Sequence, residues 1–276
     1  MLGYEPVFEY KKQSDKEDLI SLLEDKSNNS EILFVYKNNE SLLDDISVQL
    51  HTLIAKGTQF IEYSDFYEYI ERKIPPEDIG ETWFLSNILL WKRRPYFIFK
   101  RVADIAFSLF GLMLSVWLWP FIALLIHLDS NGTVFFIQER EGRGGRKFNL
   151  YKFRSMYVDK KQVTRVGHLL RATRLDELPQ FINVIKGDMS LIGPRPEQPK
   201  IATELEQEVP WYRQRLLVRP GITGWDQVCG EYHSASKEDT FKKLQSDLYY
   251  IKNCSLFLDI SIIFKTVGTV FRREGK

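Results

Sequence analysis

The longest apolar stretch of the chain runs from Ile105 to Leu128 and contains no charged side chain. A straight helix over this stretch would be about 36 Å long, compared with about 30 Å for the hydrocarbon core of a bilayer. Its length therefore permits a membrane helix. Pro120 lies inside the stretch, and a proline in a helix interior removes a hydrogen bond and kinks or breaks the helix.

Basic residues flank this stretch on both sides, and positive charge marks the cytoplasmic side of a membrane segment. Both ends are therefore expected on the same side. A re-entrant helix over about 102–128 that enters the bilayer, breaks near Pro120 and returns satisfies both observations, with Ser115 as a candidate partner for the freed backbone groups. An ordinary spanning helix and a buried core helix remain the alternatives. The flanking residues are Lys92, Arg93, Arg94, Lys100, Arg101, Arg140, Arg143, Arg146 and Lys147.

The first third of the chain has a different pattern. Short apolar runs predict strands at Glu31–Tyr36 and Gln59–Tyr63, separated by an amphipathic helix from Asn38 to Ala55. This small β-α-β unit would occupy residues 1–73, and residues 74–99 would connect it to the rest. No glycine-rich phosphate loop follows the first strand. We therefore expect a packing or regulatory appendage rather than a nucleotide site.

The remaining pattern predicts a mixed but mostly helical body. Thr133–Gln138 and Phe148–Phe153 are predicted to form a hairpin around a basic, glycine-rich turn. Helical spacing appears at Lys237–Ile251 and Leu256–Phe271, and the second of these could pack on the core or contact a membrane interface. The expected fold class is α+β: a mostly helical, monotopic membrane protein whose main domain covers residues 100–276.

Composition narrows the functional classes. The 276-residue chain has a formal net charge of +1, so its charge does not favour nucleic-acid binding. Its two cysteines form no CxxC pair or disulfide framework, as is typical of a reducing compartment. Its four histidines lack the spacing of zinc ligands.

The candidate chemistry centres on Asp176 and Glu177, which are predicted to open a helix. Pro179 would lie in its first turn and Gly187 would end it. The positive end of a helix favours negative charge, so low carboxylate pKa values are expected. An ionised aspartate can act as a nucleophile or metal ligand, with the adjacent glutamate in a second role. Acidic residues at helix starts are, however, more often only caps.

Cations surround this acidic pair in the sequence. Arg195 stands between two prolines, which suits bidentate recognition of phosphate. Lys152 and Arg154 share a face of the second hairpin strand, where they are either solvated or bind an anionic group. Arg171 and Arg174 precede the acidic pair. They could pair with the carboxylates or neutralise substrate phosphates, and the sequence leaves both roles open.

Long motifs in a fixed order resemble the bacterial sugar transferases, which are monotopic polyprenyl-phosphate phosphoglycosyl transferases. The resemblance covers about Lys100 to Val270. The matching stretches are Lys100-Arg101-x-x-Asp104, FFIQEREGRGGRKFNLYKFRSM (Phe135 to Met156), LRATRLDELPQFINVIKGDMSLIGPRPE (Leu170 to Glu197), VRPGITGWDQV (Val218 to Val228) and DLYYIKNCSLFLDISIIFKT (Asp247 to Thr266).

The resemblance implies a mechanism. Asp176 would attack the β-phosphorus of a UDP-sugar, UMP would leave, and polyprenyl (undecaprenyl) phosphate would then take the phosphosugar from the aspartate. Glu177 would act as a Mg²⁺ ligand or general base, with Asp176 as the other metal ligand, because a diphosphate carries charge that must be neutralised. Lys152, Arg171 and Arg195 match positions expected to hold phosphates or the nucleotide. Arg219 and Asp247 also match the family pattern, without a defined role. With Arg154, which is included because it shares a strand face with Lys152, the candidate substrate- and phosphate-binding set is Lys152, Arg154, Arg171, Arg195, Arg219 and Asp247.

The same resemblance implies a place and partners. The catalytic domain would lie on the cytoplasmic face of a bacterial inner membrane, and its product would start exopolysaccharide, O-antigen or glycan assembly. The expected partners are a UDP-sugar, polyprenyl phosphate and the lipid bilayer, with a homodimer left open and no nucleic acid. Two other functions are considered: a non-catalytic membrane-anchored assembly or regulatory protein, and a magnesium-dependent phosphohydrolase of a lipid diphosphate.

Overall fold

The computed structural model describes residues 33–36, 54–55, 59–160, 162–229 and 236–271. The chain separates into two compact units, Met1–Arg72 and Lys73–Lys276. In the smaller unit, β1 (Leu33–Tyr36) pairs in parallel with β2 (Gln59–Glu62), and α4 (Tyr63–Glu71) follows. Both predicted strands are confirmed. The helix predicted over Asn38–Ala55 falls almost entirely outside the described residues.

In its described residues, the larger unit is mostly helical and has two pairs of short strands. The predicted hairpin is confirmed: β3 (Phe135–Glu141) pairs antiparallel with β4 (Lys147–Phe153) around the turn η4 (Arg143–Gly145). A parallel pair, β5 (Ser190–Ile192) and β6 (Gly221–Thr223), was not predicted, because three-residue strands have no readable period. The helices of this unit are α5 (Glu81–Asn87), η2 (Leu90–Arg93), α6 (Arg94–Ser115), η3 (Val116–Leu118), α7 (Trp119–Asp129), α8 (Arg165–Ala172), η5 (Leu175–Glu177), α9 (Gln180–Lys186), α10 (Pro199–Glu208), η6 (Tyr212–Leu217), α11 (Trp225–Val228), α12 (Lys237–Asn253) and α13 (Leu256–Phe271).

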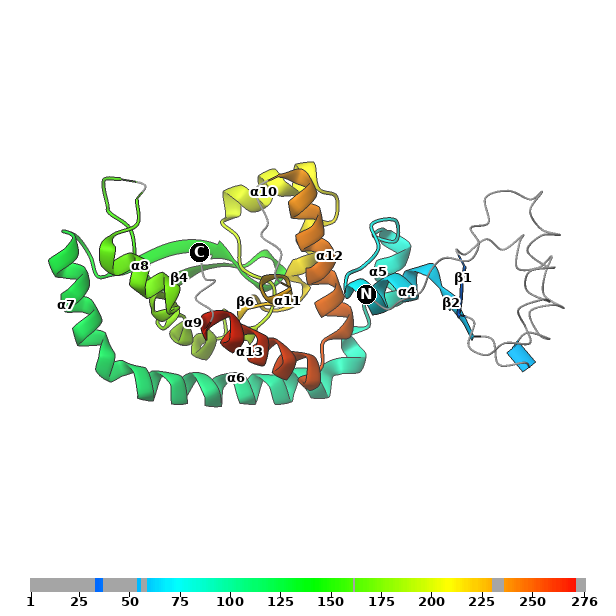
Figure 1. Ribbon diagram of the computed structural model, residues 1–276, viewed down its shortest axis with the longest axis horizontal. Coiled ribbons are helices and arrows are strands. Elements are labelled where there is room, and N and C mark those ends of the chain that lie inside the picture. Colours follow the sequence, from blue (N-terminus) through cyan, green and yellow to red (C-terminus); the bar gives the residue numbers. More distant parts are fainter. Residues whose placement is uncertain (1–32, 37–53, 56–58, 161, 230–235, 272–276) are drawn as a thin grey trace. The chain divides into compact units, whose positions relative to one another are not determined.

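The apolar stretch forms α6 and α7, joined by the 3₁₀ turn η3. Pro120 lies in the first turn of α7, where its missing N–H is tolerated. Figure 1 shows α7 leaving the line of α6 at an angle. The Ser115 hydroxyl donates to the carbonyl of Leu112 at 3.4 Å, and the backbone N–H of Val116 also points to that carbonyl. At the change from α-helix to 3₁₀ turn, these two donors are therefore bonded within the helical stretch.

Within the described part of the chain, one helical stretch, Arg94–Asp129, is long and apolar enough to cross a membrane. Most of its surface faces outwards instead of into the protein. Such an exposed apolar surface marks a membrane or protein contact, whereas the core helix of a soluble protein would be covered. The exposed side chains of α6, η3 and α7 include Ile98, Phe99, Val102, Phe107, Leu109, Phe110, Met113, Leu114, Val116, Trp117, Leu118, Phe121, Leu124, Leu125 and Leu128.

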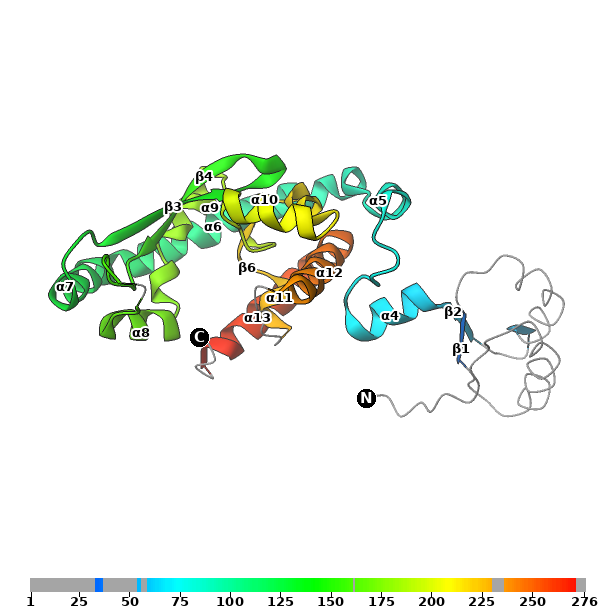
Figure 2. The same cartoon turned by 90° about the horizontal axis from the view of Figure 1, so that it is seen from above.

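Helix α9 lies between the hairpin and α6, and the hairpin runs roughly along α6 in both views (Figures 1 and 2). The fully buried side chain of Asn183 joins α9 to β4. Its amide nitrogen donates to the carbonyl of Asn149 at 2.7 Å, and its amide oxygen accepts the N–H of Tyr151 at 3.1 Å. This two-way bond sets the position of α9 against β4, and the residues just before α9 carry the candidate chemistry.

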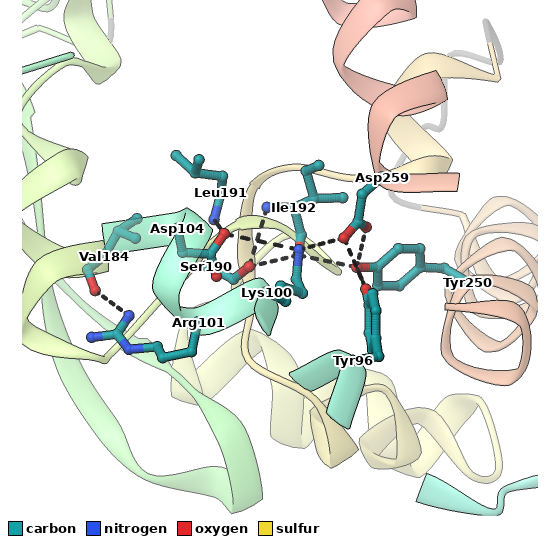
Figure 3. A network of polar contacts seen from close by, with 10 residues as sticks. All are labelled: Tyr96, Lys100, Arg101, Asp104, Val184, Ser190, Leu191, Ile192, Tyr250 and Asp259. Carbon is teal, nitrogen blue, oxygen red and sulfur yellow. Dashed lines mark hydrogen bonds and ion pairs between the residues drawn. The ribbon is translucent and has the colours of Figure 1, made fainter. Parts of the chain in front are cut away.

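The motif that begins with Lys100 attaches α6 to the rest of the unit (Figure 3). Lys100 pairs with Asp259 of α13 at 2.9 Å, and Asp104 accepts the backbone N–H of Leu191 in β5 at 3.2 Å. Arg101 donates to the carbonyls of Val184 and Ile185 at the end of α9. Three polar side chains on an apolar helix therefore each contact a different element of the body.

Candidate functional site

Asp176 and Glu177 occupy the single 3₁₀ turn η5, and α9 begins only at Gln180 after Pro179. The sequence predicted that Asp176 and Glu177 open the helix that Gly187 ends. This prediction is wrong, because the pair lies in the 3₁₀ turn just before that helix. Arg174 has a left-handed backbone (φ 57°) and separates α8 from η5, whereas Pro179, which has no N–H to donate, lies between η5 and α9. The predicted helix end is confirmed: Gly187 has φ 95°, and its N–H bonds back to α9 carbonyls.

Glu177 is held by three cations from different parts of the chain. Its Oε1 accepts from the Lys152 ammonium at 2.6 Å and lies 3.6 Å from the Arg195 guanidinium. Its Oε2 lies 3.9 Å from Arg174. Glu177 is 8% exposed, so these charges act through little water. The glutamate therefore positions cations from β4, from the turn before η5 and from the proline-bounded segment.

The two carboxylates respond oppositely to this environment. Burial opposes ionisation of Glu177, but the charges of Lys152 and Arg195 outweigh it and lower its pKa. Burial, together with the adjacent Glu177 charge, raises the pKa of Asp176 despite the pull of Lys152 and Arg171. The expected low carboxylate pKa is confirmed for Glu177 and wrong for Asp176. Environments that separate the pKa values of neighbouring carboxyls are typical of sites with two roles.

Both carboxylates line one open pocket, and the cations predicted around them lie there as well. Phosphate groups would find several guanidinium and ammonium donors beside a buried aspartate. Aromatic and apolar side chains from β3 and from the loop after β4 line another part of the same pocket. Its lining includes Phe135, Phe136, Gln138, Arg140, Lys152, Arg154, Tyr157, Val158, Asp159, Arg171, Arg174, Asp176, Glu177 and Arg195.

Two of the predicted cations, Arg154 and Arg171, donate hydrogen bonds to other groups of the protein. Arg154 is 6% exposed and donates to the backbone carbonyls of Ser130 and Asn131 at 2.7 and 2.9 Å. It thereby joins the end of α7 to the end of β4. Arg171 donates its Nε–H to the Ser155 hydroxyl at 2.9 Å and lines the pocket, and its terminal nitrogens take no part in that hydrogen bond.

Asp247 does not line the pocket, but Arg215 connects it to Arg195, which does. Asp247 is 1% exposed and pairs with Arg215 at 2.7 Å; burial raises its pKa although Arg215 pulls it the other way. Arg215 in turn donates to the backbone carbonyl of Arg195 at 2.9 Å. Asp247 therefore supports the backbone that carries Arg195.

Sequence reasoning missed Glu197, a further part of this support. Glu197 lies near Arg140 (3.8 Å) and Arg215 (3.5 Å) and accepts a hydrogen bond from Lys243. Burial opposes its ionisation, but the charges of Lys243 and Arg215 lower its pKa. Its place directly after Pro196 was the available signal. Arg215, on a 3₁₀ helix without a clear pattern, offered none.

Arg219 is not brought to Asp176. Its Nε–H donates to the carbonyl of Gly187 at 3.0 Å, and its side chain lines a different pocket beside α6. Arg219 therefore does not share a pocket with the two carboxylates.

Asp176 and Glu177 are also the predicted ligands of Mg²⁺. In the part of the chain that the structure describes, no group of three or more His, Cys, Asp or Glu side chains is placed to hold a metal ion. Mg²⁺ is commonly bound by one or two carboxylates while substrate phosphates and waters complete its shell. Asp176 and Glu177 would be the carboxylates for that arrangement, in which the ion is shared with a diphosphate, although Oε1 of Glu177 already accepts from Lys152.

Comparison with known proteins identifies a family that this chain matches. A family model described as bacterial sugar transferase matches residues 95–273. A UDP-N-acetylgalactosamine-undecaprenyl-phosphate N-acetylgalactosaminephosphotransferase of Aeromonas hydrophila is 48% identical over 192 residues, which are 65% of this chain and 45% of that protein. A UDP-glucose:undecaprenyl-phosphate glucose-1-phosphate transferase of Escherichia coli (strain K12) is 41% identical over 183 residues, 62% of this chain and 39% of that protein.

A shorter relative shows how much of the chain the family shares. Exopolysaccharide production protein PSS of Rhizobium leguminosarum bv. phaseoli is 39% identical over 193 residues, 64% of this chain and 96% of that protein. The chain thus aligns with less than half of the two longer relatives and with nearly all of the shorter one. Because the family model covers more than half of the chain and includes the whole carboxylate pocket, this chain belongs to the bacterial sugar transferase family.

Proposed function

We propose that this chain transfers a sugar 1-phosphate from a UDP-sugar to polyprenyl phosphate through a covalent intermediate on Asp176. The observation that carries the proposal is the pocket in which a buried aspartate lies beside Lys152, Arg171, Arg174 and Arg195. The relatives from A. hydrophila and E. coli are named as transferases that act on undecaprenyl phosphate. The non-catalytic alternative gives no physical reason for a glutamate held by three cations beside a buried aspartate.

In the first step, a carboxylate oxygen of Asp176 attacks the β-phosphorus of the donor. An oxygen–phosphorus bond forms, the bond from that phosphorus to the bridging oxygen breaks, and UMP leaves with the electron pair. Lys152 and Arg195, which Glu177 positions, neutralise charge that develops on the phosphate oxygens. Mg²⁺ held by Asp176 or Glu177 together with the diphosphate would supply further neutralisation.

In the second step, an oxygen of polyprenyl phosphate attacks the same phosphorus. The phosphorus–oxygen bond to Asp176 breaks, and the carboxylate returns to its ionised form. A diphosphate-linked lipid sugar is the product. The acceptor arrives with its own negative charge, so the same cations serve both steps.

We place the pocket at a membrane surface. The broken helix of α6 and α7, with basic residues at both ends and exposed apolar side chains between, suits a re-entrant segment that leaves both ends on the cytoplasmic face. A monotopic arrangement of this kind in the bacterial inner membrane would let a long lipid present its phosphate at the pocket.

UMP release from a panel of UDP-sugars, in nanodiscs with Mg²⁺ and with or without undecaprenyl phosphate, tests the function. We expect UMP release from one donor that continues only with acceptor and stops at about one equivalent without it, because the first step loads Asp176 before the acceptor binds. Sugar phosphate formed without acceptor would support a phosphohydrolase instead. Absence of UMP with every donor, for folded protein with lipid present, would favour the non-catalytic alternative.

The pH dependence of the first step tests the roles of the two carboxyls. Asp176 must be ionised to attack, and its pKa is raised, so activity should fall on acidification at a higher pH than for an ordinary aspartate. Glu177→Gln removes a neighbouring negative charge and frees Lys152 to face Asp176. The acidic limb of kcat/KM should therefore move to lower pH.

The alkaline limb of kcat/KM should also move to lower pH in Glu177→Gln. Burial lowers the pKa of Lys152 and Glu177 counteracts this, so Lys152 should lose its proton at lower pH in Glu177→Gln. Asp159→Gln, a change at an exposed acid lining the same pocket, is the control and should leave both limbs in place. If the acidic limb of kcat/KM in Glu177→Gln stayed at the same pH or moved to higher pH, Asp176 would not be the group that must be ionised.

A further inference from the structure

Arg219 lies in a second pocket, beside α6 and separate from the carboxylate pocket. Three arginines from distant parts of the chain line it: Arg101 from α6, Arg143 from the hairpin turn and Arg219 from the segment before β6. The function proposed above uses none of them. The other lining residues are Phe97, Lys100, Asp104, Ser190, Ile192, Leu217, Val218 and Tyr250.

Among the described residues, no carboxylate lies within 4 Å of the three guanidinium groups as an ion-pair partner. Asp104 is the one acid among the lining residues, and its carboxylate accepts the N–H of Leu191 and lies 3.9 Å from Lys100. Three positive charges thus meet with little local compensation. Partial burial, followed by the charges of Arg101 and Arg143, lowers the pKa of Arg219.

Capping of α9 explains only part of this arrangement. Arg101 donates to the carbonyls of Val184 and Ile185, and Arg219 donates to that of Gly187, so both stabilise the negative end of that helix. Figure 3 shows Arg101 reaching to Val184, away from the Lys100–Asp259 pair. Arg219 uses only its Nε–H in this contact. Arg143 makes no such contact in the described part of the chain, so capping gives no reason for its presence.

The position of the pocket suggests what the free donors meet. The turns of α6 that carry Phe97 and Arg101 also carry Ile98 and Val102, which are 68% and 63% exposed. Exposed apolar side chains next to a basic pocket are the pattern of a lipid headgroup site. Guanidinium groups bind phosphate oxygens in pairs, with geometry that lysine cannot supply.

We propose that Arg101, Arg143 and Arg219 form a second anion site that binds a phosphate group, carried by an anionic phospholipid or free in solution. Binding there would neutralise the three charges and join the hairpin turn, α6 and the end of α9. The site does not depend on the transferase proposal, because it shares no lining residue with the carboxylate pocket.

Native mass spectrometry of the full chain in neutral detergent, titrated with phosphatidylglycerol or with phosphatidylcholine, tests the site. The wild type should retain phosphatidylglycerol more tightly. Arg143→Gln should weaken that binding by about fivefold or more, the effect of one basic residue near a membrane surface. Arg146→Gln is the matched control, because Arg146 is an exposed arginine of the same turn that does not line the pocket.

Excess inorganic phosphate distinguishes the two sources. If inorganic phosphate displaces phosphatidylglycerol from the wild type but not from Arg143→Gln, the site binds a phosphate group whether it is free or part of a lipid. Retention of the lipid against phosphate would assign it to a headgroup. Equal weakening in Arg143→Gln and Arg146→Gln, or equal retention of both lipids by the wild type, would overturn the proposal.

Discussion

Asp176→Asn is expected to lower acceptor-dependent UMP release by about 10⁴-fold or more, the scale of loss when a covalent nucleophile is removed. An amide oxygen is a far weaker nucleophile than a carboxylate and cannot form the acyl phosphate. The measurement is the steady-state rate of UMP release from the preferred donor with undecaprenyl phosphate present, with wild type and variant under the same lipid conditions.

The same substitution should leave the fold intact. The pKa of Asp176 is raised in the folded protein, so its proton stabilises the folded state at low pH and that contribution is lost as pH rises. At neutral pH the ionised side chain therefore opposes folding, and Asn should keep or increase the thermal midpoint. Asp159→Asn, at the exposed acid in the same pocket, should keep full activity. Undiminished UMP release by Asp176→Asn would remove the nucleophile assignment.

Asp259→Asn is expected to lower the free energy of unfolding by about 3–5 kcal/mol, the cost of breaking a buried ion pair by removing one partner. Asp259 accepts from Lys100 at 2.9 Å, from Tyr96 at 2.8 Å and from Tyr250 at 2.9 Å (Figure 3). Lys100 and Asp259 are only 8% and 6% exposed. Asparagine would leave the Lys100 charge buried, with Asp104 at 3.9 Å as its remaining acidic neighbour.

Chemical denaturation in detergent, monitored by circular dichroism, measures this loss. The control is Glu139→Gln, which removes an ion pair with Lys147 in which both side chains are more than half exposed. That change should cost less than about 1 kcal/mol. Equal effects of the two substitutions would show that the Lys100–Asp259 pair does not hold α6 to α13.

Much of the carboxylate pocket could be predicted from short stretches of sequence. Asp176 and Glu177 are adjacent, and Arg195 stands between two prolines on a stiff backbone. The alternating pattern around Lys152 predicted the strand that carries it, and the structure brings that lysine to Glu177. The glycine that ends α9 was also readable, because a left-handed residue is best supplied by glycine.

Contacts between charged residues that lie far apart in the chain could not be predicted from the sequence. Lys100 and Asp259 lie 159 positions apart, and no local pattern connects them. Arg154 and Arg171 were both predicted to bind phosphate, yet Arg154 donates to two backbone carbonyls while Arg171 donates through its Nε–H to the Ser155 hydroxyl. A residue's type and spacing predict which atoms it can offer, but the packed chain decides which partners reach them.

The sequence by itself determined the long apolar helical stretch, the hairpin, the acidic pair and the proline-bounded arginine, because each depends on neighbours within a few residues. Only the tertiary structure decided that Asp176 and Glu177 have opposite pKa shifts and that Arg219 belongs to another pocket. Both outcomes depend on burial and on charges brought from other elements. Coulomb energies change severalfold between water and a protein interior, so the same residues acquire different properties once the chain has folded around them.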